Sequence, residues 1–164
     1  MGLLKKLFGG GDAPGPPTAG GDTDVSSPAR NGGDGDAVTA DNVAAAFGAE
    51  VVDRTVEIDD GDVVNVVFHL RGGDDPSVSV FVCNHTGRPG MADDDESCWR
   101  DLGVARELSG LGDSAFVNEE GTLFARLGDR YTIQILTPKE GPDDGDARRS
   151  RALARSILDR LEGD

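Results

Sequence analysis

Lysine, cysteine and aromatic residues are scarce in this 164-residue chain, and each scarcity narrows what the protein can be. The only lysines are Lys5, Lys6 and Lys139, in a chain whose formal net charge is -15. Binding to nucleic acid relies on clustered basic side chains that neutralise phosphates, so we expect no nucleic-acid partner. The two cysteines are too few for a disulfide-stapled secreted scaffold.

Long apolar runs are also missing. No segment approaches the run of about 18 apolar residues that a membrane-spanning helix requires. The opening residues lack the apolar stretch of about seven or more residues and the cleavage site of a signal peptide, and no cysteine near the start could accept a lipid. We expect a cytoplasmic protein, whose opening stretch decides whether it is free or peripheral at the inner face of the membrane.

Acidic residues, by contrast, are abundant and spread along the whole chain. Asp and Glu number 31 against 16 Lys and Arg, with more aspartate than glutamate and more arginine than lysine. These preferences remove apolar methylene groups from the surface, which favours solubility where salt strengthens hydrophobic association. The composition therefore predicts a protein of an extreme halophile. At molar salt the Debye length is about 3 Å, so the net charge itself says little about partners.

Composition divides the chain into three segments. Residues 1–8 form an amphipathic stretch, residues 9–37 a linker rich in Gly, Pro and Asp, and residues 38–164 a single folded domain. The linker contains one large aliphatic residue, Val25, and cannot bury enough surface to offset its ordering entropy. We expect it to be disordered and to let the domain move about 30 Å from whatever holds the opening stretch.

The opening stretch, MGLLKKLFGGG, places large apolar side chains and lysines on opposite sides of a short helix. The residues concerned are Leu3, Leu4, Lys5, Lys6, Leu7 and Phe8. This pattern is typical of an interfacial membrane anchor and resembles the membrane-targeting sequences of cell-division proteins. Two turns are too short for a stable isolated helix, so binding should be weak and reversible. The alternatives are a protein partner, packing on the chain's own domain, or a disordered start.

Alternating apolar residues, turn residues and helix-capping signals predict an α+β domain. The domain should contain a largely antiparallel sheet of six or seven strands, covered by about three helices. The predicted helices span residues 40–47, 91–103 and 146–161, and the predicted strands include 51–58, 63–71, 77–85 and 104–108. The last helix carries its aliphatic residues on one side, which should lie on the sheet, and arginines on the other.

The motif GLGDSAF at residues 110–116, followed by G-x-L at 121–123 and Gly-Asp at 128–129, resembles a family of small uncharacterised lipoprotein-type domains. The resemblance covers about residues 39–162. It implies a sandwich of α/β/α type similar to the PsbP and Mog1 proteins, and transfers no catalytic residue. Turn geometry selects Gly and Asp, so we interpret these motifs as turns between strands.

Cys83, His85 and Cys98 are the one set of residues whose chemistry is worth testing. Cys83 and His85 share a face of the predicted 77–85 strand, and Cys98 follows on the next helix, so the three could supply zinc ligands. Their spacing matches no familiar zinc motif, and a fourth ligand is unassigned. A Cys83–Cys98 disulfide is a second possibility, and two reduced thiols are the default for a reducing cytosol.

The remaining candidates have structural explanations. The acidic run at residues 93–96 begins a predicted helix, where acids meet the positive end of the dipole. His69 is expected in or near the core, and the arginines of the last helix should pair with nearby acids. No phosphate-binding loop, nucleophile elbow or metalloprotease motif occurs. The sequence therefore predicts no catalytic residue and no cofactor.

These observations favour a non-enzymatic interaction or adaptor domain, tethered reversibly by residues 3–8 to the membrane surface or to a membrane-associated protein. One alternative is a carrier of a small molecule or lipid, with a pocket between sheet and helices. A second is a metal-binding protein that uses Cys83, His85 and Cys98. The sequence leaves the oligomeric state open.

Overall fold

The computed structural model describes residues 34–72, 76–137 and 144–163. The opening stretch and most of the predicted linker lie outside the described residues. The helices are η1 (Asp34–Ala37, a 3-10 helix), α1 (Ala40–Phe47), α2 (Met91–Asp101) and α3 (Asp144–Gly163). The strands are β1 (Val51–Asp59), β2 (Val63–Leu70), β3 (Ser77–Asn84), β4 (Val104–Glu107), β5 (Ser114–Asn118), β6 (Leu123–Leu127) and β7 (Tyr131–Leu136).

The seven strands form one sheet in the order β1-β2-β3-β7-β6-β5-β4, and every neighbouring pair is antiparallel. β1 to β3 form one meander and β4 to β7 a second. The two meanders meet only where β3 pairs with β7. The predicted α+β class and its mainly antiparallel sheet are confirmed.

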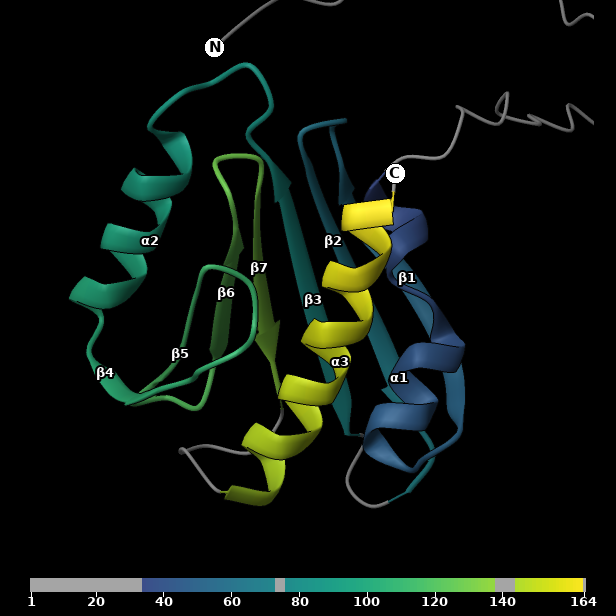
Figure 1. Cartoon of the computed structure of the whole chain (residues 1–164). Coiled ribbons are helices and arrows are strands. Elements are labelled where there is room, and N and C mark those ends of the chain that lie inside the picture. The colour runs from purple at the N-terminus through teal and green to yellow at the C-terminus, as the bar shows by residue number, and fades with distance from the viewer. Residues whose placement is uncertain (1–33, 73–75, 138–143, 164) are drawn as a thin grey trace, which may run out of the picture.

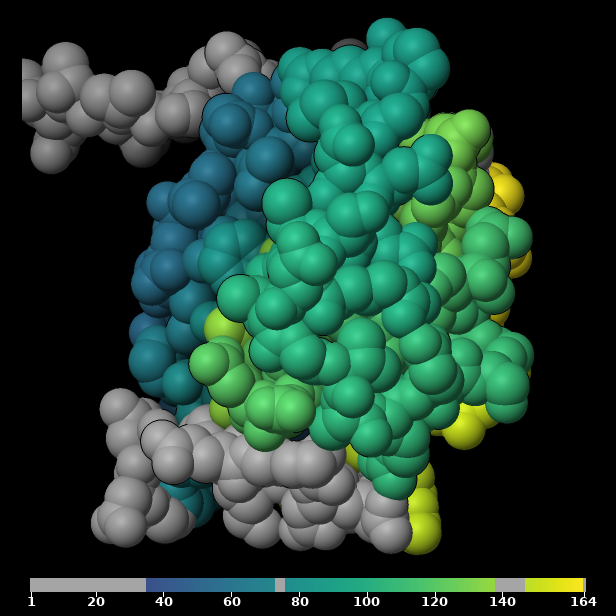
Figure 2. All heavy atoms as spheres, turned by 90° about the vertical axis from the view of Figure 1, so that its left-hand side faces the viewer, coloured from purple at the N-terminus to yellow at the C-terminus, as the bar shows by residue number. Residues whose placement is uncertain are grey.

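The helices lie on both faces of the sheet. α1 and α3 pack against each other and on one face, while α2 contacts β6 and β7 on the other (Figure 1). Figure 2 looks onto α2, which stands in front of the sheet with part of the first meander beside it. α2 reaches this face because it connects β3, in the middle of the sheet, to β4 at the far edge.

The hydrophobic core fills the space between the sheet and the α1–α3 layer. Alternation along β3 buries Val78, Val80 and Val82 completely, while the residues between them are only partly buried. β7 contributes Ile133 and Ile135 to the same face. The aliphatic side of α3 covers this surface through fully or almost fully buried residues, namely Leu153, Ala154, Ile157, Leu158 and Leu161. The predicted orientation of the last helix is therefore confirmed.

The described fold begins at residue 34, four residues before the predicted start of the domain at residue 38. Residues 34–37 form η1, and Ala37 is buried in the core together with Val38. Arg160 of α3 donates to the Asp36 carbonyl across this junction. The composition of residues 34–37 resembles that of the linker. The buried Ala37 side chain and the hydrogen bond to the Asp36 carbonyl nonetheless hold this segment on the domain.

The two Gly-Asp turns of the second meander are bonded to each other. The Asp113 carboxylate accepts a hydrogen bond from the Gly128 backbone N–H, and the Asp113 N–H donates to the Arg126 carbonyl. Gly112 lies against this junction with φ +59°, and an added Cβ would come within 2.1 Å of the Arg126 oxygen. The interpretation of both motifs as turns fits this geometry.

Replacing Gly112 by alanine should therefore be far more costly than the same change at Gly128. Gly128 also has a positive φ, +56°, but a Cβ there would meet nothing within 4 Å. We expect Gly128→Ala to lower the free energy of unfolding by about 1–2 kcal/mol through backbone strain alone. Gly112→Ala should lower it by at least about 3 kcal/mol, because the backbone must also shift. Denaturant unfolding of both variants measures the difference, and equal losses would contradict this account.

Candidate functional site

The sheet face under α2 carries polar side chains beside a stacked aromatic pair, whereas the opposite face is largely aliphatic. Strand alternation that sends Ile133 and Ile135 into the core sends Thr132 and Gln134 toward α2, and the neighbouring strand presents Arg126 beside them. Thr132 and Gln134 are nonetheless buried, at 0% and 6% exposure. Buried polar groups need partners, and α2 supplies them through its acidic residues.

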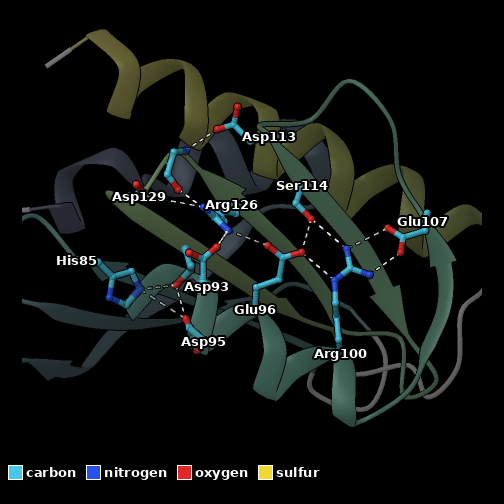
Figure 3. Close-up of polar contacts among 12 residues, drawn as sticks. His85, Asp93, Asp95, Glu96, Arg100, Glu107, Asp113, Ser114, Arg126 and Asp129 are labelled. Atoms are coloured by element: carbon cyan, nitrogen blue, oxygen red, sulfur yellow. Dashed lines mark hydrogen bonds and ion pairs between the residues drawn. The ribbon is translucent and has the colours of Figure 1, made fainter. Parts of the chain in front are cut away.

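Glu96 holds the middle of α2 to the sheet (Figure 3). Its Oε1 accepts from the Ser114 hydroxyl at 2.6 Å and from Arg100 Nε at 2.8 Å, and its Oε2 accepts from Arg126 Nη1 at 3.3 Å. The carboxylate is only 14% exposed. One anion thus joins α2, β5 and β6.

Charged partners extend the contacts of Glu96 on both sides. Arg126 also pairs with Asp93 and with Asp129, the latter at 2.8 Å. Arg100 reaches Glu107 and lies 4.5 Å from the ring centroid of Phe116. Phe116 stacks in turn on Phe124 with ring centroids 5.0 Å apart. α2 is therefore bound to the second meander by both ionic and aromatic contacts.

The same contacts set the protonation of the site. Burial by itself raises the pKa of Glu96, but the hydrogen bonds from Ser114, Arg100 and Arg126 outweigh it and hold that pKa below its ordinary value. The carboxylates of Glu107 and Glu96 raise the pKa of Arg100 further above its usual range. Glu96 and Arg100 are therefore both ionised at neutral pH.

A second polar cluster is built on Asp95, the neighbour of Glu96 in α2, and on His85, which follows the end of β3. His85 Nε2 lies 3.0 Å from the Thr132 hydroxyl and 3.6 Å from Asp95 Oδ2. Thr132 donates to the same Asp95 oxygen, and Gln134 Nε2 donates to it at 3.4 Å. His85 is 7% exposed. The acid, the hydroxyl and the imidazole satisfy one another, which accounts for the burial of this histidine.

An apolar groove opens beside this cluster, between α2 and the first meander. We call it the α2 groove. It has a volume of about 300 Å³ and is open to solvent, and apolar atoms form most of its wall. Val63 and Cys83 come from the sheet, Met91 and Cys98 from α2, and Asp62 and Asp94 lie at its edge. Figure 2 looks toward this side of the molecule.

The structure brings the three predicted site residues to this groove. Cys83, His85 and Cys98 all line it, and both thiols are free. Within the described ranges, however, no three His, Cys, Asp or Glu side chains are arranged to hold a metal ion. His85 already bonds Thr132. The membrane-targeting residues Leu3 to Phe8 lie outside the described residues, so their role stays a prediction.

Sequence reasoning missed the partners under α2. Asp95 and Glu96 were assigned to the helix dipole, although their carboxylates bond the sheet. A usable signal was present, because Thr132, Gln134 and Arg126 are polar residues at core-like strand positions that require buried partners. Two arginines of α3 have backbone partners that the sequence did not indicate, because Arg151 and Arg155 donate to the carbonyls of Ser109 and Gly110.

Comparison with protein-family models, curated proteins and solved structures finds no match to this chain. The class that the structure defines is thus an α+β domain with helices on both faces of an antiparallel sheet. The resemblance to lipoprotein-type and PsbP/Mog1-like domains stays a prediction. None of the helices in the described ranges is both long and apolar enough to span a bilayer.

Replacing Glu96 by glutamine should destabilise the fold most at neutral pH. The variant leaves Arg126 and Arg100 with a weaker acceptor, which should lower the free energy of unfolding by about 1–3 kcal/mol. Because the pKa of Glu96 is below its ordinary value of 4.5 in the folded state, its contribution is present above that value and is lost as pH falls through the folded pKa. Wild type and Glu96→Gln should therefore converge in acid.

Urea unfolding at a series of pH values measures this convergence. Glu162→Gln on the exposed side of α3 serves as the control. It should track wild type at every pH. A constant difference between wild type and Glu96→Gln down to strong acid would show that Glu96 acts through its shape and not through its charge.

The Cys83 thiol should resist alkylation at neutral pH. Burial, together with the negative charge of Asp95, raises its pKa to about 11. Only about one thiol in a thousand is then ionised at pH 8, and the thiolate is the reactive form. In a Cys98→Ser variant, the rate of iodoacetamide labelling should rise with pH toward a midpoint near 11. A midpoint near the ordinary cysteine value of about 8.5 would refute the assigned environment.

Proposed function

We propose that the chain is a non-enzymatic interaction domain held reversibly at the inner face of the membrane, or to a protein there, by residues 3–8. The observation that supports this most directly is the α2 groove, an open apolar depression on the surface of a strongly acidic domain. A contiguous exposed apolar patch is more often a binding site than the rest of a protein surface. A segment with an apolar face and a basic face would complement it.

Exposed large hydrophobic side chains on β1 and α2 also suit a binding role, although Val56, which pairs with core-facing Val66, lies on the opposite face of the sheet from the groove. Val52, Val56 and Ile58 of β1 are 41–52% exposed, and Met91 at the groove is 44% exposed. Together they make up four of the five exposed large hydrophobic residues in the described ranges. The apolar surface of the domain is therefore concentrated on β1 and the start of α2.

The interaction domain is favoured over the carrier by where apolar space is found. A carrier would need an enclosed pocket between sheet and helices. The layer between the sheet and α3 is occupied by side chains such as Phe68, Leu153 and Ile157, all at 0% exposure. In the described part of the chain, the hollows with mainly apolar walls, one beside α3 at Leu108 and Ala147 and the other the α2 groove, are both open to solvent.

Flotation with anionic liposomes in molar KCl tests the tether. We expect the full chain to float and a Leu4→Asp/Leu7→Asp variant to stay in the dense fraction. Two leucines contribute about 3–6 kcal/mol of apolar burial, so their loss should weaken binding by at least about 100-fold. A Thr18→Asp/Val25→Asp variant adds the same charge within the linker and should float like wild type.

A full chain that stays in the dense fraction at every lipid concentration would sink the membrane part of this proposal. The tether would then be a protein contact. Equal flotation of all three chains would instead place the membrane contact on the folded domain.

A further inference from the structure

We propose that the α2 groove is the intramolecular binding site of residues 3–8, so that the opening segment binds its own domain when it is not bound elsewhere. This inference deepens the proposed function and rests on it only for the amphipathic character of that segment. It assigns one occupant to the groove, and it makes the tether a segment with two alternative sites.

Apolar complementarity is the first argument. Half-buried Val63 and Cys83 lie on the sheet side, and exposed Met91 and Cys98 lie on the α2 side of a hollow of about 300 Å³. Leu3, Leu4, Leu7 and Phe8 offer a continuous apolar face of about 140° when helical. Docking an amphipathic helix in such a groove is a common mode of recognition. Docking would bury apolar surface of the groove and of the segment at the same time.

Charge complementarity is the second argument, and it acts only at contact distance because salt screens longer-range fields. The groove is lined by three carboxylates, those of Asp62, Asp94 and Asp95, and by one guanidinium, that of Arg88. Asp62 also pairs with Arg88, while Asp94 is exposed at the first turn of α2. The opening segment carries Lys5 and Lys6, two of the three lysines in a chain of net charge -15. With the apolar face on the groove, these ammonium groups lie toward the solvent and its acidic edge.

The connecting chain is long enough to reach. The described fold begins at Asp34 in η1, which packs beside β2 close to Val64. Val63, the preceding residue, lines the groove on the other side of the sheet. About 25 residues separate the opening segment from Asp34, and a Gly-rich chain of that length spans about 25–30 Å on average. Crossing from one side of the sheet to the other needs no more than this.

Tethering also explains how a short segment can occupy the groove. A flexible linker of this length holds its end at an effective concentration in the millimolar range. Weak contacts then suffice for binding within the chain. The bound segment must leave the groove before it can bind a membrane, and a partner that fills the groove releases the segment.

The cysteines of the groove report its occupancy without any added label. Cys98 is exposed in the described fold, so residues 3–8 in the groove should shield it from iodoacetamide. In full-length protein without lipid, we expect Cys98 to react at least about fivefold faster in Leu4→Asp/Leu7→Asp than in wild type. Thr18→Asp/Val25→Asp should react at the wild-type rate. Peptide mass spectrometry assigns the label to Cys98 or Cys83. Equal Cys98 rates in all three chains would overturn the proposal.

A cross-link separates binding within one chain from binding between two. In a Leu4→Cys variant, oxidised glutathione should join residue 4 to Cys98 as a disulfide within the monomer, at a rate independent of protein concentration. Cross-linked dimers whose yield rises with concentration would overturn the intramolecular site and assign the groove to a second copy. Both experiments contain no membrane, so their failure is distinct from a failure of liposome flotation.

Discussion

The bond between the Glu96 carboxylate and the sheet is the constraint on which the rest of the second face depends. α2 has few buried apolar residues of its own, with Ala92 the one buried residue of the helix. Its position is instead set by Glu96, which accepts from Ser114, Arg100 and Arg126. A charged hydrogen bond is shorter and stronger than a neutral one. Glu96 therefore contributes strongly to the register of α2, together with Asp95 and the contact of Arg100 with Phe116, whereas aliphatic packing holds the opposite layer.

This placement of α2 creates the functional surface. The helix lies over the second meander, so the first meander is left beside it and the α2 groove forms along the boundary. At the buried end of that boundary, Asp95 and Thr132 bond each other and Thr132 bonds His85. The polar clusters are therefore the framework of the site. The surface available to a partner is the apolar strip next to them.

Local signals predicted the elements of this fold well, because each was encoded by neighbouring residues. Thr39 caps α1 as its side chain accepts from the Asn42 N–H, and the β3 alternation placed Val80 inward. The contacts of α2 were less accessible. The sequence shows that residues 93–96 are acidic, but which acid faces Arg126 depends on the rotation of the helix and on strands about 30 residues away. The same limit applies to the α2 groove, whose walls come from three elements that only the folded topology brings together.

The seam between the two meanders has a consequence for how the chain reaches this structure. Within each meander, neighbouring strands follow each other closely in the chain. The β3–β7 bonds, from Asn84–Tyr131 to Ser79–Leu136, each close a loop of roughly fifty residues. The two halves of the sheet can therefore assemble from local contacts, and their union carries the largest loop-closure entropy. α3 and α2 both contact β7 at that seam, so the layers on the two faces add to the β3–β7 pairing in holding the halves of the sheet together.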